Sequence, residues 1–279
     1  STQAKTLFPY TTLFRSFSRF DAFGQYGAAL KQQISHAADP ETTIEAHGLT
    51  RGGGFADQYR YPEYVDVGEV IANGLKAQKE GYDGFLLGNI VDPGIRELRE
   101  LLTIPVLGLC ESTLSIACMM GSLYTMVTVN PKFTPRVLEN VHRYGFYPRM
   151  ASYEAMKVHN LTDLAVGFSD APEHAVAREA IFEEFRQAAR RGIEKGAEVI
   201  VAAGGVVMAM LAHANVHDVD GVPILNGTVA LTKMGETAVK IQRLTGNFTS
   251  KHLTYAPPRG ELLKEVRRVY GTDAYPGID

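Results

Sequence analysis

The sequence has no tryptophan and little cysteine, with only Cys110 and Cys118 among its 279 residues. Two thiols eight residues apart are typical of reduced cysteines in a cytosolic protein rather than of a disulfide framework. The sequence also has no Cys/His spacing of the kind that binds a metal, and no Walker-type phosphate loop. We therefore expect no structural disulfide, no metal site and no cofactor.

Long apolar runs and an excess of basic charge are absent as well. No run approaches the roughly 20 apolar residues that a membrane-spanning helix requires, and the formal net charge is -3. Without a basic surface to hold a phosphate backbone, nucleic acid is not expected as a partner. The chain also does not open with the charged and then apolar segments of a signal peptide. We therefore predict a soluble, cytoplasmic protein without a membrane partner.

The N-terminal stretch LFPYTTLFRS, residues 7–16, resembles translated sequencing-adapter read-through found in assembled environmental reads. We therefore predict that residues 1–16 include a non-native start, and we infer no function from residues before Ser16. The aromatic and β-branched residues of this stretch nevertheless favour a strand over residues 10–17.

Strand and helix patterns alternate through most of the chain, and 45% hydrophobic content is ample for a buried core. Strands are expected at 43–49, 85–91, 104–109, 123–129, 197–203 and 222–225, with helical segments between them. One of these helices is expected over 66–79 and another starts at Asp92-Pro93-Gly94, whereas residues 150–170 read as polar and irregular. Such alternation indicates an α/β fold of mainly parallel sheet flanked by helices. Ligands of these folds bind at the carboxyl ends of strands. The candidate site residues are therefore sought at and just beyond the strand ends.

Four segments that span these strand ends are GYDGFLLGNIVDPGIRELRE at 81–100, IPVLGLCESTLSIA at 104–117, GAEVIVAAGGVVMAML at 196–211 and PILNGTVALTKMGETAVKI at 223–241. In combination they resemble the aspartate/glutamate/hydantoin racemase superfamily. The resemblance implies two pseudo-symmetric lobes with the active-site cleft between them, lobe 1 being 1–109 plus 226–279 and lobe 2 being 110–225. It also implies a cofactor-independent enzyme for a small carboxylate, hydantoin or imide-like metabolite, and a homo-oligomer.

Racemases of the resembled family carry one cysteine at a strand end in each lobe. One thiolate removes a proton from the carbon next to a carbonyl, and the opposite thiol returns one. Asn89 and Gly204 stand where these two cysteines would fall. Neither residue exchanges a proton near neutral pH. Ordinary two-cysteine racemisation is therefore not expected. Other isomerase chemistry, lyase or decarboxylase chemistry, hydrolysis and non-catalytic metabolite binding remain open.

Each candidate catalytic group has a functional and a structural interpretation. Asn89 either donates its amide to a developing oxyanion or caps a turn. Gly204 and Gly205 either present backbone N–H groups at a helix N-terminus to an anion or form a tight turn. Cys110 is either a nucleophile or acid, or a small buried apolar residue. Glu111 is either a general acid/base or a first-turn glutamate that stabilises the helix dipole.

Further polar residues near strand ends are candidates for substrate binding. A hydroxyl near Thr128 helps to hold the substrate carboxylate in the resembled family, whereas Asn130 precedes a proline and equally suits a turn. The remaining candidates are Ser16 and Ser18 after the first strand, Ser112 at the start of a helix, and Asn226, which either caps a helix or contacts the cleft.

Overall fold

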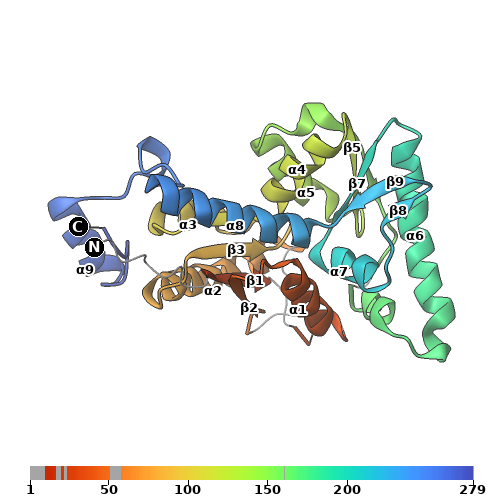
Figure 1. Cartoon of the computed structure of the whole chain (residues 1–279), viewed down its shortest axis with the longest axis horizontal. Helices are drawn as coiled ribbons and strands as arrows, with labels where there is room; N and C mark the ends of the chain where they lie inside the picture. Colours follow the sequence, from red (N-terminus) through yellow and green to blue (C-terminus); the bar gives the residue numbers. More distant parts are fainter. Residues whose placement is uncertain (1–9, 17–19, 22–23, 51–57, 160, 279) are drawn as a thin grey trace, which may run out of the picture.

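Two mainly parallel sheets, each flanked by helices, form the two lobes of the protein in a computed structural model (Figure 1). The structure describes residues 10–16, 20–21, 24–50, 58–159 and 161–278. The α/β, two-lobed fold predicted from the sequence is confirmed.

The first lobe contains a four-stranded parallel sheet in the order β2-β1-β3-β4. The predicted strand near the N-terminus is present as β1, which pairs with both β2 and β3. The strands are β1 (Tyr10–Ser16), β2 (Thr42–His47), β3 (Gly84–Gly88) and β4 (Val106–Gly108), and the associated helices are α1 (Tyr26–Ala37), α2 (Arg60–Lys79) and α3 (Ile95–Leu101).

The second lobe contains a sheet in the order β6-β5-β7-β9-β8, parallel except for the β8–β9 pair. Its strands are β5 (Tyr124–Thr128), β6 (Met150–Ala155), β7 (Val199–Ala203), β8 (Asp218–Val219) and β9 (Val222–Leu225). Its helices are α4 (Leu109–Met120), α5 (Thr134–Arg143), α6 (Ala175–Ile193) and α7 (Gly205–His213), with 3-10 turns η2 (Tyr147–Arg149), η3 (Leu161–Phe168) and η4 (Pro172–His174).

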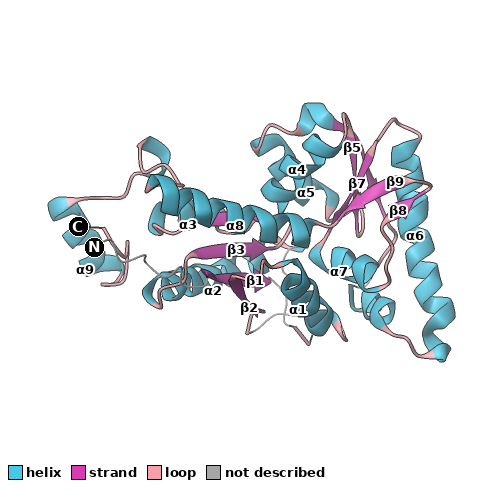
Figure 2. Ribbon diagram, in the orientation of Figure 1, coloured by secondary structure: helices cyan, strands magenta, loops and turns pink. Residues whose placement is uncertain are grey.

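Helix α8 (Gly227–Thr245) leaves the second sheet and returns to the first lobe, where it packs along β3 (Figure 2). The approach is close because Gly235 has no side chain: a Cβ there would lie 2.7 Å from Leu86 Cδ2. The chain continues through η5 (Leu253–Tyr255) to α9 (Gly260–Tyr270), at the end of the molecule remote from the second sheet.

One hydrophobic cluster contains buried residues of both lobes, and a second, smaller cluster lies within the first lobe. Every residue of β3, β5 and β7 is buried, as expected for parallel strands covered on both faces. Ile90 and Leu109, which follow β3 and β4, belong to the same apolar cluster as Met208 and Leu225 of the second lobe. The carboxyl ends of the two sheets are therefore joined by apolar packing.

Two local expectations differ from the structure. Residues 150–170 read as irregular, yet they contain the edge strand β6, whose one buried residue is the polar Glu154 and whose exposed residue is Tyr153, so no apolar alternation marks it. Helix α2 begins at Arg60, six residues before the expected start, because Arg60 and Glu63 pair with Glu139 and Arg136 of α5. No described helix combines the length and the apolar character needed to cross a membrane.

Candidate active site at the junction of the two sheets

The start of α7 lies directly against the carboxyl end of β3. A Cβ added to Gly205 would be 3.4 Å from the Gly88 carbonyl oxygen and 3.9 Å from the Tyr26 hydroxyl. Asn89 follows Gly88 and Gly204 precedes Gly205, so the two segments singled out in the sequence meet between the lobes. We call this meeting point, residues 88–89 and 204–205, the junction.

The first turn of α7 offers backbone donors at the junction. Met208 N donates to Gly204 O at 2.9 Å, which is the first bond of the helix. The N–H groups of residues 205–207 therefore precede the helical ladder, at the positive end of the helix dipole. Such a helix start is suited to holding an anion or a carbonyl oxygen that gains negative charge.

Gly204 does not need to be glycine for reasons of backbone conformation or space. Its φ of 174° is extended, a conformation that any residue adopts. A Cβ there would lie 3.5 Å from Val129 Cγ1 and 3.8 Å from Val207 Cγ2, which is ordinary van der Waals contact. A side chain at this position is therefore compatible with the fold.

Asn89 is buried, with 7% of its surface exposed. Its Oδ1 accepts a hydrogen bond from Val91 N at 2.8 Å, and its backbone oxygen accepts one from Asp92 N at 3.0 Å. The side chain therefore caps the turn after β3, as its structural interpretation requires. These two bonds hold Asn89 at the junction. Its contact with a substrate stays a prediction.

Asp92 is a buried carboxylate whose importance the sequence did not reveal. It accepts hydrogen bonds from Cys110 N at 3.0 Å, Glu111 N at 3.1 Å and the Tyr144 hydroxyl at 2.8 Å. It thus caps α4 from another segment, and a Cβ on Gly108 would clash with its carboxyl group. Burial raises the pKa of Asp92 to about 7. Asp-Pro-Gly in the sequence suggested only the start of a helix.

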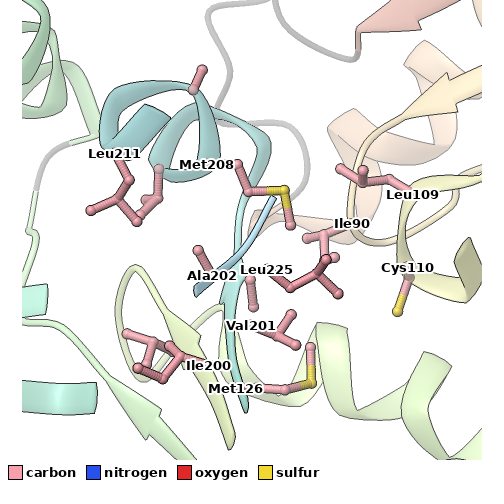
Figure 3. Packing of buried hydrophobic residues seen from close by; sticks show 14 of the residues in the cluster. Ile90, Leu109, Cys110, Met126, Ile200, Val201, Ala202, Met208, Leu211 and Leu225 are labelled. Atoms are coloured by element: carbon pink, nitrogen blue, oxygen red, sulfur yellow. The ribbon is translucent and has the colours of Figure 1, made fainter. Parts of the chain in front are cut away.

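Cys110 lies inside the apolar core, as Figure 3 shows with Ile90 and Leu109 nearby. It is fully buried. Burial, together with the carboxylates of Asp92 and Glu111, raises the pKa of the thiol well above its usual value. A thiolate is therefore disfavoured, and these contacts support the packing interpretation over the nucleophilic one.

Glu111 is directed toward α3 by an ion pair. Its Oε2 accepts a hydrogen bond from Arg99 Nη2 at 2.5 Å, and 31% of its side chain is exposed. This partner gives the carboxylate a structural function in the first turn of α4. Ser112, the next residue, is buried at 2% exposure. The roles in proton transfer and substrate binding predicted for Glu111 and Ser112 remain predictions.

The polar residues after β5 bond mainly to one another and to the nearby backbone. Thr128 Oγ1 and Thr134 Oγ1 are 2.7 Å apart. Asn130 Oδ1 accepts from Phe133 N at 3.0 Å, and its Nδ2 donates to Val158 O at 3.1 Å. These bonds support the turn interpretation of Asn130. The Thr128 hydroxyl, which was predicted to hold a carboxylate, is buried and bonded to Thr134.

The remaining candidates occupy different places. Asn226 caps α8, its Oδ1 accepting from Thr228 N at 3.0 Å and Val229 N at 3.3 Å, and it lines a separate cavity beside His36 and His217. Ser16 pairs in register with Gly88, so its backbone lies at the junction. Ser18 lies outside the described residues.

Metal-binding clusters are absent from the part of the chain that the structure describes. No group of three or more His, Cys, Asp or Glu residues there is arranged to hold a metal ion.

Comparison with known proteins identifies the family. The Asp/Glu/Hydantoin racemase family model matches residues 25–235, and the chain belongs to this family. Hydantoin racemase of Pseudomonas sp. (strain NS671) is 31% identical over 234 residues, covering 82% of this chain and 87% of that protein.

Two solved structures of allantoin racemases are similar along most of their length. The enzyme from Pseudomonas fluorescens is 27% identical with a TM-score of 0.72, covering 90% of this chain and 97% of that one. The enzyme from Klebsiella pneumoniae is 25% identical with the same TM-score, covering 90% and 94%. The chain is thus a racemase-superfamily enzyme that is similar to hydantoin and allantoin racemases.

Proposed function

We propose that the junction binds a small cyclic ureide, the five-membered ring type of hydantoin and allantoin, and stabilises negative charge on a ring carbonyl. The observation that carries this proposal is the 3.4 Å approach between the Gly205 Cβ position and Gly88 O. It brings the α7 donors next to the segment that holds Asn89. The names of the relatives supply the class of substrate.

Charge stabilisation at the junction suits chemistry at the carbon next to that carbonyl. When this carbon loses a proton, the electron pair spreads onto the carbonyl oxygen as an enolate. Preorganised N–H donors at the start of α7, with the Asn89 amide, lower the energy of that oxyanion. A buried site strengthens these interactions because water does not screen them. Proton exchange at the ring carbon is the reaction that we propose first.

The proton does not pass between a pair of thiols in this proposal. Asn89 and Gly204 supply no acid or base, the Cys110 thiol is enclosed in the core, and Glu111 is paired with Arg99. We propose water as the proton carrier. Water can return the proton to either face of a planar enolate, so slow racemisation accompanies exchange.

The same feature favours a second candidate, a lyase reaction of the decarboxylase type. Loss of carbon dioxide from a carboxylated substrate breaks a C–C bond and leaves the electron pair on the ring carbon, so no base is required. The resulting enolate needs the same oxyanion donors and then takes a proton from water. Ring hydrolysis and metabolite binding without turnover are also compatible with a pocket that holds a ureide.

Deuterium exchange distinguishes these reactions. Hydantoin or allantoin is incubated in D₂O with the protein, and proton NMR follows the ring C–H signal against a protein-free blank. We expect exchange above the blank. Asn89→Asp keeps Oδ1 as the acceptor for Val91 N but removes the amide donor, so exchange should fall about 100-fold. The matched control Asn247→Asp, at an exposed asparagine after α8, should exchange like the wild type.

Other outcomes contradict the proposal. Ring opening in the same NMR spectra would indicate a hydrolase. Carbon dioxide release from a carboxylated analogue without exchange would indicate the lyase. Ureide binding without turnover would favour a metabolite-binding protein. Loss of exchange in Glu111→Gln or Cys110→Ser would restore these residues as proton carriers in place of water.

A further inference from the structure

A second cavity of about 470 Å³ lies between α2, α5 and the loop after β3. Its wall includes the apolar side chains of Val67 and Ile71 from α2 and Ile95 from α3. Asn89, Gly204 and Gly205 are not among the described residues that line it. We call this cavity the arginine cleft because Arg60, Arg96, Arg136 and Arg143 line it.

Two of these arginines are neutralised by carboxylates. Arg136 pairs with Glu63 and Glu139, and Arg60 pairs with Glu139. The Arg136–Glu63 and Arg60–Glu139 pairs connect α2 to α5, and the Arg136–Glu139 pair lies within α5. Because the two cations and two anions balance, this cluster forms a rigid, neutral part of the wall and has little attraction for a further ion.

Arg96 and Arg143 provide the excess positive charge. Both are exposed, and neither makes an ion pair within 4.0 Å of any residue that the structure describes. Outside the neutral cluster, Glu97 is the one exposed carboxylate of the described lining. Asp92 lies at the buried base of the cleft, where hydrogen bonds from the start of α4 hold its carboxyl. Within the described lining, two guanidinium groups without an ion pair therefore face one exposed carboxylate.

We propose that the arginine cleft binds a small carboxylate that carries an apolar group. A guanidinium donates two parallel hydrogen bonds to a carboxylate, which makes arginine well suited to this anion. The apolar group would lie against Val67, Ile71 and Ile95. A cavity of this volume falls within the usual range for a small-molecule site. The base of the cleft is the loop after β3, which also carries Asn89. A ligand in the cleft would therefore contact the same loop that places Asn89 at the junction.

Calorimetric titration with phenylacetate tests this proposal, with two comparison compounds. Phenylacetamide has the same apolar body without the charge, and acetate has the charge without the body. We expect phenylacetate to bind more tightly than either. Arg96→Gln and Arg143→Gln should each weaken phenylacetate binding about tenfold, the loss of one charge-assisted interaction. Arg259→Gln, an exposed arginine at the start of α9, should bind like the wild type.

Three results would overturn the proposal. Phenylacetamide could bind as tightly as phenylacetate, or both cleft variants could retain full affinity with unchanged circular dichroism. Phenylacetate binding could also be lost in the Asn89→Asp variant and unchanged in the Arg143→Gln variant, which would place phenylacetate at the junction instead. Since the titration measures binding alone, its result is independent of whether the junction exchanges a ring proton.

Discussion

Installing cysteines at positions 89 and 204 should convert the junction into a two-thiol racemase site. The structure accepts the change at Gly204, where the backbone is extended and a Cβ meets Val129 at 3.5 Å. Replacing Asn89 removes the bond from Val91 N, which costs about 1–2 kcal/mol. That loss is small against a typical unfolding free energy of about 5–15 kcal/mol, so the double variant should fold.

The expected gain follows from the contribution of positioned acids and bases. One such group typically accelerates a reaction about 10²–10⁴-fold. The Asn89→Cys, Gly204→Cys variant should therefore racemise a 5-substituted hydantoin at least about 100-fold faster than the wild type. Chiral chromatography of the two enantiomers measures this rate, and NMR in D₂O checks that the ring proton exchanges.

The matched control is the Asn89→Ser, Gly204→Ser variant, which has nearly the same shape without thiols of suitable acidity. It should racemise no faster than the wild type. Equal rates for two folded double variants, one with cysteines and one with serines, would show that positions 89 and 204 do not face one substrate from opposite sides. The reasoning about the junction would then be refuted.

Three further predictions concern the buried groups around the start of α4. The pKa of Asp92 is about 7 in the folded protein, against an ordinary value of 3.8 that we take for the unfolded chain. Between these two values the native protein keeps a proton that the unfolded chain releases. The resulting stabilisation of the folded state is complete below about pH 4 and is lost as the pH rises through 7. Urea unfolding should show that loss, on the order of 4 kcal/mol, and Asp92→Asn should lack it; identical pH profiles would contradict the assignment. Gly108→Ala should lower the unfolding free energy by about 2–3 kcal/mol through its clash with Asp92, and an unchanged melting temperature would argue against that contact. Cys110 should resist iodoacetamide at neutral pH until the protein unfolds, so rapid labelling of its peptide, measured by mass spectrometry, would show that the thiol is accessible.

Much of the fold could be predicted because its signals are local. The buried runs that became β3, β5 and β7 are rich in apolar residues and are followed by turn signals. Strand β6 was missed because its buried residue is the polar Glu154, so the sequence shows no apolar run there. The early start of α2 depends on ion pairs to α5, which no local pattern encodes.

That residues 88–89 and 204–205 come together was predictable, but their hydrogen bonds were not, and their role in a site stays a prediction. Strand-end reasoning found Asn89 and Gly204, because parallel strands direct their following loops to one edge. It could not foresee that Asp92 would reach Cys110 N and Glu111 N, a contact between segments 18 residues apart. Nor could it choose between capping and substrate contact for Asn226. The lobe boundaries at 109/110 and 225/226 and the homo-oligomer stay predictions.

A crystal structure with a hydantoin bound tests the central claim most directly. We predict a ring carbonyl oxygen within about 2.7–3.1 Å of a backbone N–H in the first turn of α7, with the ring beside Asn89. A ring bound in the arginine cleft, or elsewhere with the junction empty, would contradict the proposed site.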